Sequence, residues 1–154
     1  MTYVRRALPG DAAEILPLAR AFHAESPHHR PLPFSDSRVL ALIGMATMSP
    51  DWCALVACDD NGAIVGLALY FLSAAYFSDS TEVYDLTFWV APEQRKRSSA
   101  AYKLAAAVVK WAMDKGAVRI NQGVLTGINH DEAIPFFKGM GFEPKGEILV
   151  RTLR

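Results

Sequence analysis

The segment Tyr84–Gly116, YDLTFWVAPEQRKRSSAAYKLAAAVVKWAMDKG, decides the fold of this chain. Its first seven residues contain no turn former and are rich in β-branched and aromatic side chains, which predicts a strand. The strand must end before Pro92, because proline cannot donate to a sheet ladder. Beyond a short turn, small and apolar residues recur at helical spacing. These are Ala101, Leu104, Ala105, Val108 and Ala112. The segment is therefore a strand, a turn and a long helix that ends at Lys115 and Gly116.

The turn before the helix concentrates positive charge. Arg95, Lys96 and Arg97 are consecutive, and Ser98, Ser99 and Ala100 follow them, so that either serine can cap the helix. The first turn of a helix offers unpaired backbone N–H groups and the positive end of the helix dipole, which together favour a phosphate. The alternative to a phosphate site is an ordinary solvent-exposed basic loop whose serines only cap the helix. The strand–turn–helix context favours the anion site.

The composition restricts the class of protein. The 154 residues are 51% hydrophobic, which is enough to build one domain over residues 1–154. The formal net charge is 0, so there is no general basic surface and we expect no nucleic-acid partner. The N-terminus lacks the apolar core of a signal peptide, and the longest apolar stretch, Ala63–Phe77, is about 15 residues, short of the ~20 that a membrane helix needs. Cys53 and Cys58 lie on opposite sides of a predicted strand and are expected to be reduced. These features predict a cytoplasmic protein without a membrane segment.

The remaining patterns complete the expected order of elements. A strand over Thr2–Leu8 is followed by a helix in which Asp11 and Glu14 have capping-box spacing and which Pro17 interrupts. The other expected elements are a loop over 25–34, a helix from Ser35 or Asp36, strands Trp52–Cys58 and Ala63–Ser73 joined by an Asp60-Asn61-Gly62 turn, a strand Val118–Val124, a helix Asn129–Met140 and a strand Ile148–Leu153. We predict an α/β (α+β) fold with a mixed, largely antiparallel central sheet flanked by helices. The crossover through the long helix makes one pair of strands parallel.

The order of elements and the segment WVAPEQRKRSSA resemble the GNAT superfamily of acyl-CoA-dependent N-acyltransferases. The matching residues of the family's turn are Val90, Pro92, Glu93, Arg95 and Ala100. The segment GVLTGINHDEAIPFFKGMGFEP is similar to the last motif of the family, and its TGIN wording is closest to a small branch common in phages and prophages.

The resemblance implies an N-acetyltransferase that moves an acetyl group from acetyl-CoA to an amine by direct attack on the thioester. The acceptor is a small molecule or a protein amine, and a homodimer is an open alternative to a monomer. The strand separates after Val90, where its backbone pairs with the pantetheine, and no metal is expected. The resemblance implies these cofactor-binding residues: Trp89, Val90, Arg95, Lys96, Arg97, Ser98, Ser99, Ala100, Asn129 and Phe137.

Two residues depart from the family pattern. Ser98 replaces a glycine that lets backbone approach the pyrophosphate, although its hydroxyl and its N–H can still donate. Phe137 stands where the family often has a tyrosine that protonates the leaving thiolate. These departures motivate a second hypothesis, a catalytically degraded acyl-CoA-binding or interaction module of the same fold. A nucleotide-binding protein is disfavoured, because no Walker or dinucleotide glycine pattern is present.

The sequence leaves the general base open. The candidates are Asp85, on the central strand, and Glu25, in the N-terminal loop, and deprotonation through water needs neither. Asp85 could instead pair with an arginine for structural reasons, and Glu25 could be an ordinary loop charge. His28 and His29 are interpreted as surface loop residues, because adjacent histidines rarely share one metal ion.

Overall fold

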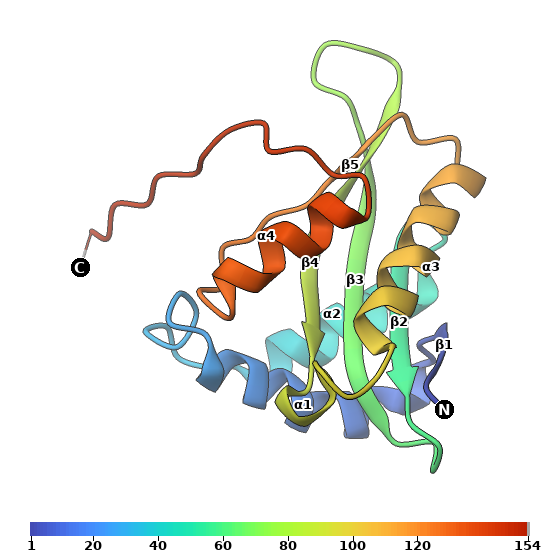
Figure 1. Cartoon of the computed structure of the whole chain (residues 1–154), viewed down its shortest axis with the longest axis vertical. Coiled ribbons are helices and arrows are strands. Elements are labelled where there is room, and N and C mark those ends of the chain that lie inside the picture. Colours follow the sequence, from blue (N-terminus) through green and yellow to red (C-terminus); the bar gives the residue numbers. More distant parts are fainter. Residues whose placement is uncertain (154) are drawn as a thin grey trace.

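The structure is a computed structural model that describes residues 1–153. A five-stranded sheet in the order β1-β2-β3-β4-β5 forms its centre (Figure 1). The strands are β1 (Tyr3–Arg6), β2 (Trp52–Cys58), β3 (Ile64–Ala74), β4 (Thr81–Val90) and β5 (Ile120–Asn121). The helices are α1 (Ala12–Glu25), α2 (Asp36–Met48), α3 (Ala100–Asp114) and α4 (His130–Gly139), with short 3-10 turns η1 (Pro9–Asp11) and η2 (Pro92–Gln94).

The sheet confirms the predicted mixed topology. Strands β1 to β4 pair antiparallel in sequence order, and β4 pairs with β5 in parallel across the α3 crossover. The β2–β3 hairpin closes at Gly62, whose φ of 84° lies in the left-handed region that glycine tolerates. The carboxylate of Asp59 accepts hydrogen bonds from the backbone N–H groups of Asn61 and Ala63 and so stabilises this turn.

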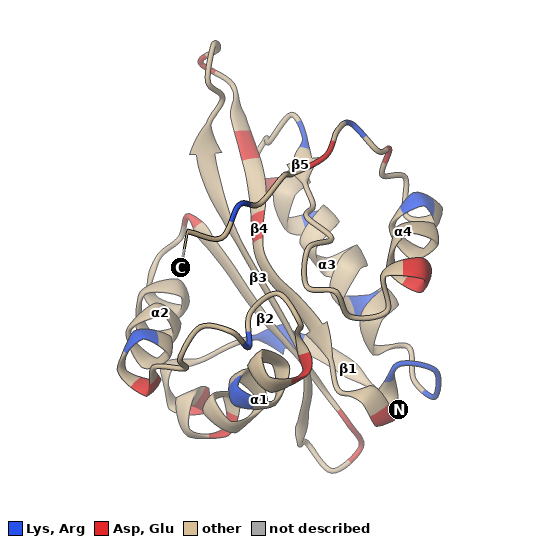
Figure 2. Cartoon of the chain, turned by 90° about the vertical axis from the view of Figure 1, so that its left-hand side faces the viewer, with Lys and Arg blue, Asp and Glu red and all other residues tan. Residues whose placement is uncertain are grey.

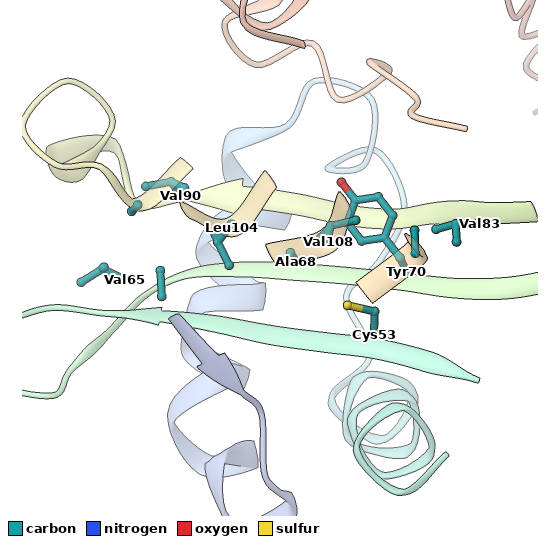
Figure 3. Close-up of a cluster of buried hydrophobic side chains, with 11 residues drawn as sticks. Cys53, Val65, Ala68, Tyr70, Val83, Val90, Leu104 and Val108 are labelled. Atoms are coloured by element: carbon teal, nitrogen blue, oxygen red, sulfur yellow. The ribbon is translucent and has the colours of Figure 1, made fainter. Parts of the chain in front are cut away.

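Helices cover both faces of the sheet. Figure 2 shows α1 and α2 on one side and α3 and α4 on the other. Leu104 and Val108 of α3 pack on the face that carries Tyr70 and Val83 (Figure 3). A second cluster under α1 and α2 fills the opposite face. Cys53 belongs to the first cluster and Cys58 to the second, and both thiols are free, as the strand alternation predicted. No helix within residues 1–153 is long and apolar enough to cross a membrane.

The N-terminal half differs from the prediction in its contacts. The predicted capping box of Asp11 and Glu14 does not form, because both carboxylates bind other groups. Asp11 accepts two hydrogen bonds from the Arg5 guanidinium, at 2.7 and 2.9 Å, and Glu14 accepts one from the backbone N–H of Ile64 at 2.7 Å. The expected interruption at Pro17 is also absent, since α1 runs through it. Ser35 caps α2 as expected, by accepting from the Arg38 N–H.

The C-terminal half has less strand than predicted. Val118–Val124 contributes only the two residues of β5, and Ile148–Leu153 forms no strand. A strand requires a partner backbone, and residues 142–153 pair with no strand of this sheet. The prediction of a final strand in the same sheet is therefore wrong for the single chain.

Candidate active site

The site begins where β4 and β5 separate. The two strands pair only at Val83–Ile120 and Tyr84–Asn121, whereas the opposite edge of β4 stays paired with β3 as far as Val90. The separation therefore starts after Tyr84, not after Val90 as the resemblance implied. From Asp85 onward, the edge of β4 that faces β5 carries backbone donors and acceptors without a strand partner.

A pocket of about 380 Å³ fills this opening. The six consecutive residues Asp85–Val90 line it from the sheet, residues 122–126 line it from the chain after β5, and α1 and α4 close its ends. A β-bulge shapes the wall, because Tyr70 pairs with Asp85 and Leu69 with Thr87, which leaves Leu86 as an additional residue in β4. The bulge bends the strand at the point where the pocket opens.

Asp85 is one of the two carboxylates that line this pocket. Its Oδ1 accepts a hydrogen bond from the Gly123 N–H at 2.9 Å, and its Oδ2 accepts one from the Gln122 Nε2 at 3.1 Å. The Gln122 Oε1 accepts in turn from the Tyr70 hydroxyl. Among residues 1–153 no cation forms an ion pair with Asp85, so the alternative of a structural arginine partner is not realised. Burial raises the pKa of this carboxyl above its usual 3.8.

Glu25 is held in a different manner. Its two oxygens lie 2.5 and 2.7 Å from the Arg95 guanidinium nitrogens, and its Oε2 also accepts from the Trp89 indole N–H at 2.9 Å. The hydrogen bonds from Arg95 are the main cause of a lowered Glu25 pKa. Both carboxylates accept a hydrogen bond on each oxygen, but the Glu25 pKa is lowered and the Asp85 pKa is raised, and a carboxylate with a lowered pKa is the weaker base. The geometry therefore favours Asp85 over Glu25 as the proton acceptor.

Arg95 lies in the turn and binds groups within the protein. Besides binding Glu25, it donates from Nε to the Val90 carbonyl oxygen at 2.8 Å. Each of its three guanidinium nitrogens therefore has a partner inside the protein. The implied role of Arg95 at the pyrophosphate stays a prediction, which requires a phosphate to compete with Glu25 for the guanidinium.

The rest of the turn remains available for an anion. The Ser98 hydroxyl donates to the Gln94 carbonyl oxygen at 3.0 Å and accepts from the Ala100 N–H at 3.3 Å, so it keeps no proton for a phosphate. Ser99 is the N-cap residue of α3, but its side chain makes no capping hydrogen bond. Arg97, Ser98 and Ser99 line a second pocket of about 440 Å³ at the N-terminal end of α3, together with Asp59 and Asp60 from the turn between β2 and β3. Ala100 is fully buried. The donors left here are first-turn backbone N–H groups and exposed cations.

Lys96 links the turn to α4. Its Nζ lies 2.9 Å from the Glu132 carboxylate, and both side chains are well exposed.

On α4, Phe137 is buried against Phe88, Phe136 and Phe142, with ring centroids 5.1 to 5.4 Å apart. It lines the main pocket, as predicted for a wall residue. Asn129 also lines the pocket, but its side chain does not cap α4. Its φ of 46° is a left-handed conformation that asparagine tolerates.

The structure brings one further segment to the pocket. His28 and His29, which the sequence placed on a surface loop, line the pocket together with Phe22, and burial lowers the pKa of His29. Fully buried Ser26 donates to the Thr126 carbonyl oxygen at 2.6 Å and so joins this loop to the chain after β5. The contact spans 100 residues, and no local sequence signal identifies it.

The predicted residues divide between two pockets. The main pocket is lined by Asp85, Trp89, Val90, Arg95, Asn129 and Phe137. The second pocket holds Arg97, Ser98 and Ser99, while Lys96 lies between α3 and α4. No cluster of three or more potential metal ligands exists within residues 1–153. The main pocket therefore contains the Asp85 carboxylate, and the second pocket contains Arg97 and the N-terminal end of α3.

Comparisons with known proteins agree with this geometry. A structure of AAC(6')-Iy in complex with a bisubstrate analogue is 20% identical, with a TM-score of 0.78 over 100% of this chain and 99% of that chain. An aminoglycoside acetyltransferase from an uncultured soil metagenomic sample, in complex with sisomicin, is 18% identical, with a TM-score of 0.74 over 99% and 97%. A Trypanosoma brucei acetyltransferase is 16% identical, with a TM-score of 0.73 over 99% and 100%. At these identities the likeness shows the fold.

The family follows from the sequence itself. The comparison with curated proteins gives no match. The model of the acetyltransferase (GNAT) family, however, matches residues 16–142, which include the separated strands, the basic turn and α4. The chain therefore belongs to the acetyltransferase (GNAT) family, as an acyltransferase that uses acetyl-CoA to acetylate an amine.

Proposed function

We propose that this protein acetylates a small amine that carries one cationic group and an apolar body, and that Asp85 accepts the proton of the amine. The observation that carries the proposal is the position of Asp85. Its carboxylate lies in the pocket where β4 and β5 separate, without an ion-pair partner in the described chain and with a pKa raised by burial.

The residues present fit acetyl-CoA. The unpaired edge of β4 between Asp85 and Val90 offers backbone groups for the amides of an extended pantetheine arm. The first-turn N–H groups of α3, with Lys96 and Arg97 beside them, suit its phosphates. Acetyl-CoA supplies the activated acetyl thioester when it is bound. A backbone N–H on the same β4 edge is the donor that stabilises negative charge on the carbonyl oxygen during attack.

Asp85 accepts the proton that the amine loses, whereas Phe137 offers no proton to the leaving thiolate. An amine is an ammonium ion near neutral pH, so it pairs with the Asp85 carboxylate and must lose a proton before it can attack. The raised pKa of Asp85 makes this carboxylate a better acceptor, directly or through a water molecule. Phe137 has no proton to donate. The leaving thiol has a pKa of about 8.5, so it departs as a thiolate without a side-chain acid.

The lining of the pocket selects the acceptor class. Aromatic rings of Phe22, Phe88 and Phe136 contribute to it. Asp85 and Glu132 are its two carboxylates, and Glu132 is paired with Lys96. One unpaired carboxylate among rings suits a monoamine with an apolar or aromatic body. Aminoglycosides, which the neighbouring enzymes acetylate, carry several ammonium groups and require more negative charge than this pocket offers.

The test is acetyl transfer from acetyl-CoA to a panel of arylalkylamines, alkylamines, polyamines and aminoglycosides, followed by release of the free thiol. We expect arylalkylamines to give the highest kcat/KM and Asp85→Asn to abolish most of it. Faster turnover of aminoglycosides would contradict the proposed class. CoA binding without transfer to any amine would favour the degraded acyl-CoA-binding module.

Four further properties belong to this proposal. We place the protein in the cytoplasm as a single domain, which is consistent with two free, buried thiols and one sheet covered on both faces. We retain the phage and prophage type as its branch within the family, on the TGIN motif. We retain a homodimer as its assembly.

A further inference from the structure

A network of side-chain hydrogen bonds leads from the core of the sheet to the carboxylate in the main pocket. The Tyr70 hydroxyl donates to the Gln122 Oε1, and the Gln122 Nε2 donates to the Asp85 Oδ2 at 3.1 Å. Tyr70 lies on β3, Asp85 on β4 and Gln122 directly after β5, so the network crosses three neighbouring positions of the sheet. In the proposed reaction only Asp85 takes part, and the other two residues have no assigned role.

Tyr70 is the donor at the buried end of this network. It is 1% exposed, and its ring lies in the hydrophobic cluster that contains Val83 and Val108 (Figure 3). Burial, and then the charge of Asp85, raise the pKa of its hydroxyl well above the ordinary 10. The hydroxyl therefore keeps its proton throughout the range in which a carboxyl titrates, and it gives that proton to the Gln122 amide oxygen.

Three partners fix the orientation of the Gln122 amide. Its oxygen accepts from Tyr70, while its Nε2 donates to the Asp85 Oδ2 and, at 2.9 Å, to the Gly123 carbonyl oxygen. Rotation of the amide by half a turn would bring its oxygen against a carboxylate and a carbonyl, neither of which can donate a hydrogen bond. Tyr70 thus directs an N–H group, and not an oxygen, at Asp85.

The Asp85 carboxylate receives one donor on each of its oxygens. The Gly123 N–H donates to Oδ1 at 2.9 Å and opposes the rise in pKa that burial causes. The Gln122 N–H on Oδ2 acts in the same direction, because a hydrogen bond to the charged form favours that form. Both oxygens are therefore held in place, and the network favours the carboxylate over the neutral acid.

The other ionisable side chains of the pocket do not replace this network. No ion pair within residues 1–153 includes Asp85, and Arg95 and Glu132 are paired with Glu25 and Lys96. The ionisable residues that share the pocket with Asp85 come from the loop after α1, the basic turn and α4, and they are His28, His29, Arg95 and Glu132.

We propose that Tyr70 and Gln122 are positioning residues of the acetyl transfer, which hold the Asp85 carboxylate unprotonated and oriented to receive the proton of the amine. Tyr70 does not line the pocket and acts through Gln122. The role in acetyl transfer rests on the proposed function, whereas the effect of the network on the Asp85 carboxyl rests on the hydrogen bonds alone.

The first test is an NMR pH titration of the Asp85 carboxyl in isotope-labelled full-length protein, with the signal assigned by its loss in Asp85→Asn. Tyr70→Phe removes one hydroxyl and lets the Gln122 amide turn its oxygen toward a protonated Asp85. We expect the titration midpoint to rise by about one pH unit, the equivalent of one hydrogen bond. Gln122→Met should raise it at least as far. Tyr84→Phe is the matched control, because it removes a hydroxyl that donates to Glu82 outside the pocket, and its midpoint should not move.

The double variant Tyr70→Phe with Gln122→Met shows whether Tyr70 acts through Gln122. A residue that acts only through another adds nothing once the other is removed, so the double variant should titrate like Gln122→Met alone. An unchanged midpoint in the single variants, an additive rise in the double variant, or an equal rise in Tyr84→Phe overturns the proposal. Circular dichroism checks folding, and half-buried Gln122 gives the decisive variant if Tyr70→Phe does not fold.

The second test is the pH dependence of kcat/KM for acetyl transfer to phenethylamine. In Tyr70→Phe we expect the acid limb to move with the Asp85 midpoint, so that kcat/KM falls about tenfold below that midpoint and keeps its plateau at higher pH. An equal loss at every pH shows a merely structural role and overturns the proposal. An Asp85 midpoint that moves as expected without the acid limb counts against Asp85 as the proton acceptor, and so against the proposed function alone.

Discussion

The guanidinium of Arg95 binds the carboxylate of Glu25 at two points, with N–O distances of 2.5 and 2.7 Å. The pair joins the C-terminal end of α1 to the turn after β4, across 70 residues of sequence. Arg95 also holds the Val90 carbonyl oxygen, and Glu25 also holds the Trp89 indole. One ion pair thus connects the end of α1 with the end of β4 beside the main pocket.

Removal of this ion pair should weaken both halves of the site. In Glu25→Gln the charged hydrogen bonds to Arg95 are lost from a mostly buried pair, and we expect the free energy of unfolding to fall by about 1–3 kcal/mol. The KM values for acetyl-CoA and for the amine should rise together. Denaturant unfolding and initial rates measure both effects. Glu132→Gln, which breaks the exposed pair with Lys96, is the control and should cost about 0.2–1 kcal/mol or less.

The same pair predicts how stability depends on pH. The Glu25 pKa is lowered from its ordinary 4.5, so its stabilisation is fully present above that value and is lost as the pH falls through the folded-state pKa. The difference in unfolding free energy between the native protein and Glu25→Gln should therefore shrink below pH 4.5. A difference that stays constant into more acidic solution would show that Glu25 does not act through its charge.

Replacement of Asp85 should separate activity from stability. Asp85→Asn cannot accept a proton, and we expect kcat/KM to fall by about 10²–10⁴. The pH dependence of the free energy of unfolding that Asp85 causes should be opposite to that caused by Glu25. The Asp85 pKa is raised above 3.8, so the folded native protein is penalised as the pH rises through that raised value, and the asparagine variant lacks this penalty. Rates and unfolding midpoints across pH test both statements, and a destabilised variant at neutral pH would contradict the second.

Phe137 should act through packing. Its ring is buried among three other phenylalanines, and Phe137→Ala should lower the unfolding free energy by about 3–5 kcal/mol through the cavity it leaves. Phe137→Tyr should keep or raise kcat, because a new hydroxyl can assist the leaving thiolate. Thermal unfolding and steady-state kinetics measure the two variants. A fully stable Phe137→Ala protein with unchanged CoA affinity would refute the alignment with the last family motif.

CoA should stabilise the folded chain through the turn at α3. A ligand at 100 times its Kd adds about 2.7 kcal/mol to the free energy of unfolding, which is visible as a higher Tm. Arg97→Ala removes an exposed cation beside the N-terminal end of α3, and we expect its Kd for CoA to rise about tenfold, or ~1.4 kcal/mol. Lys110→Ala, at the far end of the same helix, is the matched control. Equal Tm shifts in both variants would place the phosphates elsewhere.

The sequence by itself determined the order of elements around the sheet. Side-chain alternation in β2 and β3, the Gly62 turn and the helical spacing in α3 are local patterns, and each is satisfied by residues close to it in the chain. The basic turn after Val90 was predicted for the same reason. The family resemblance placed Phe137 at the pocket wall, where the structure has it.

Only the tertiary structure decided what each functional group contacts. Arg95 and Glu25 are both charged residues near predicted loops, and no local sequence signal indicates that they bind each other across 70 residues. Nor does the sequence indicate that Asp85 is the carboxylate of the main pocket that has no ion-pair partner. The contact of Ser26 with Thr126 spans 100 residues. The strand pattern of Ile148–Leu153 specifies a conformation but not a partner. Hydrogen-bond and ion-pair partners are chosen by proximity in space, which the strand register and helix packing fix only after the whole chain has folded.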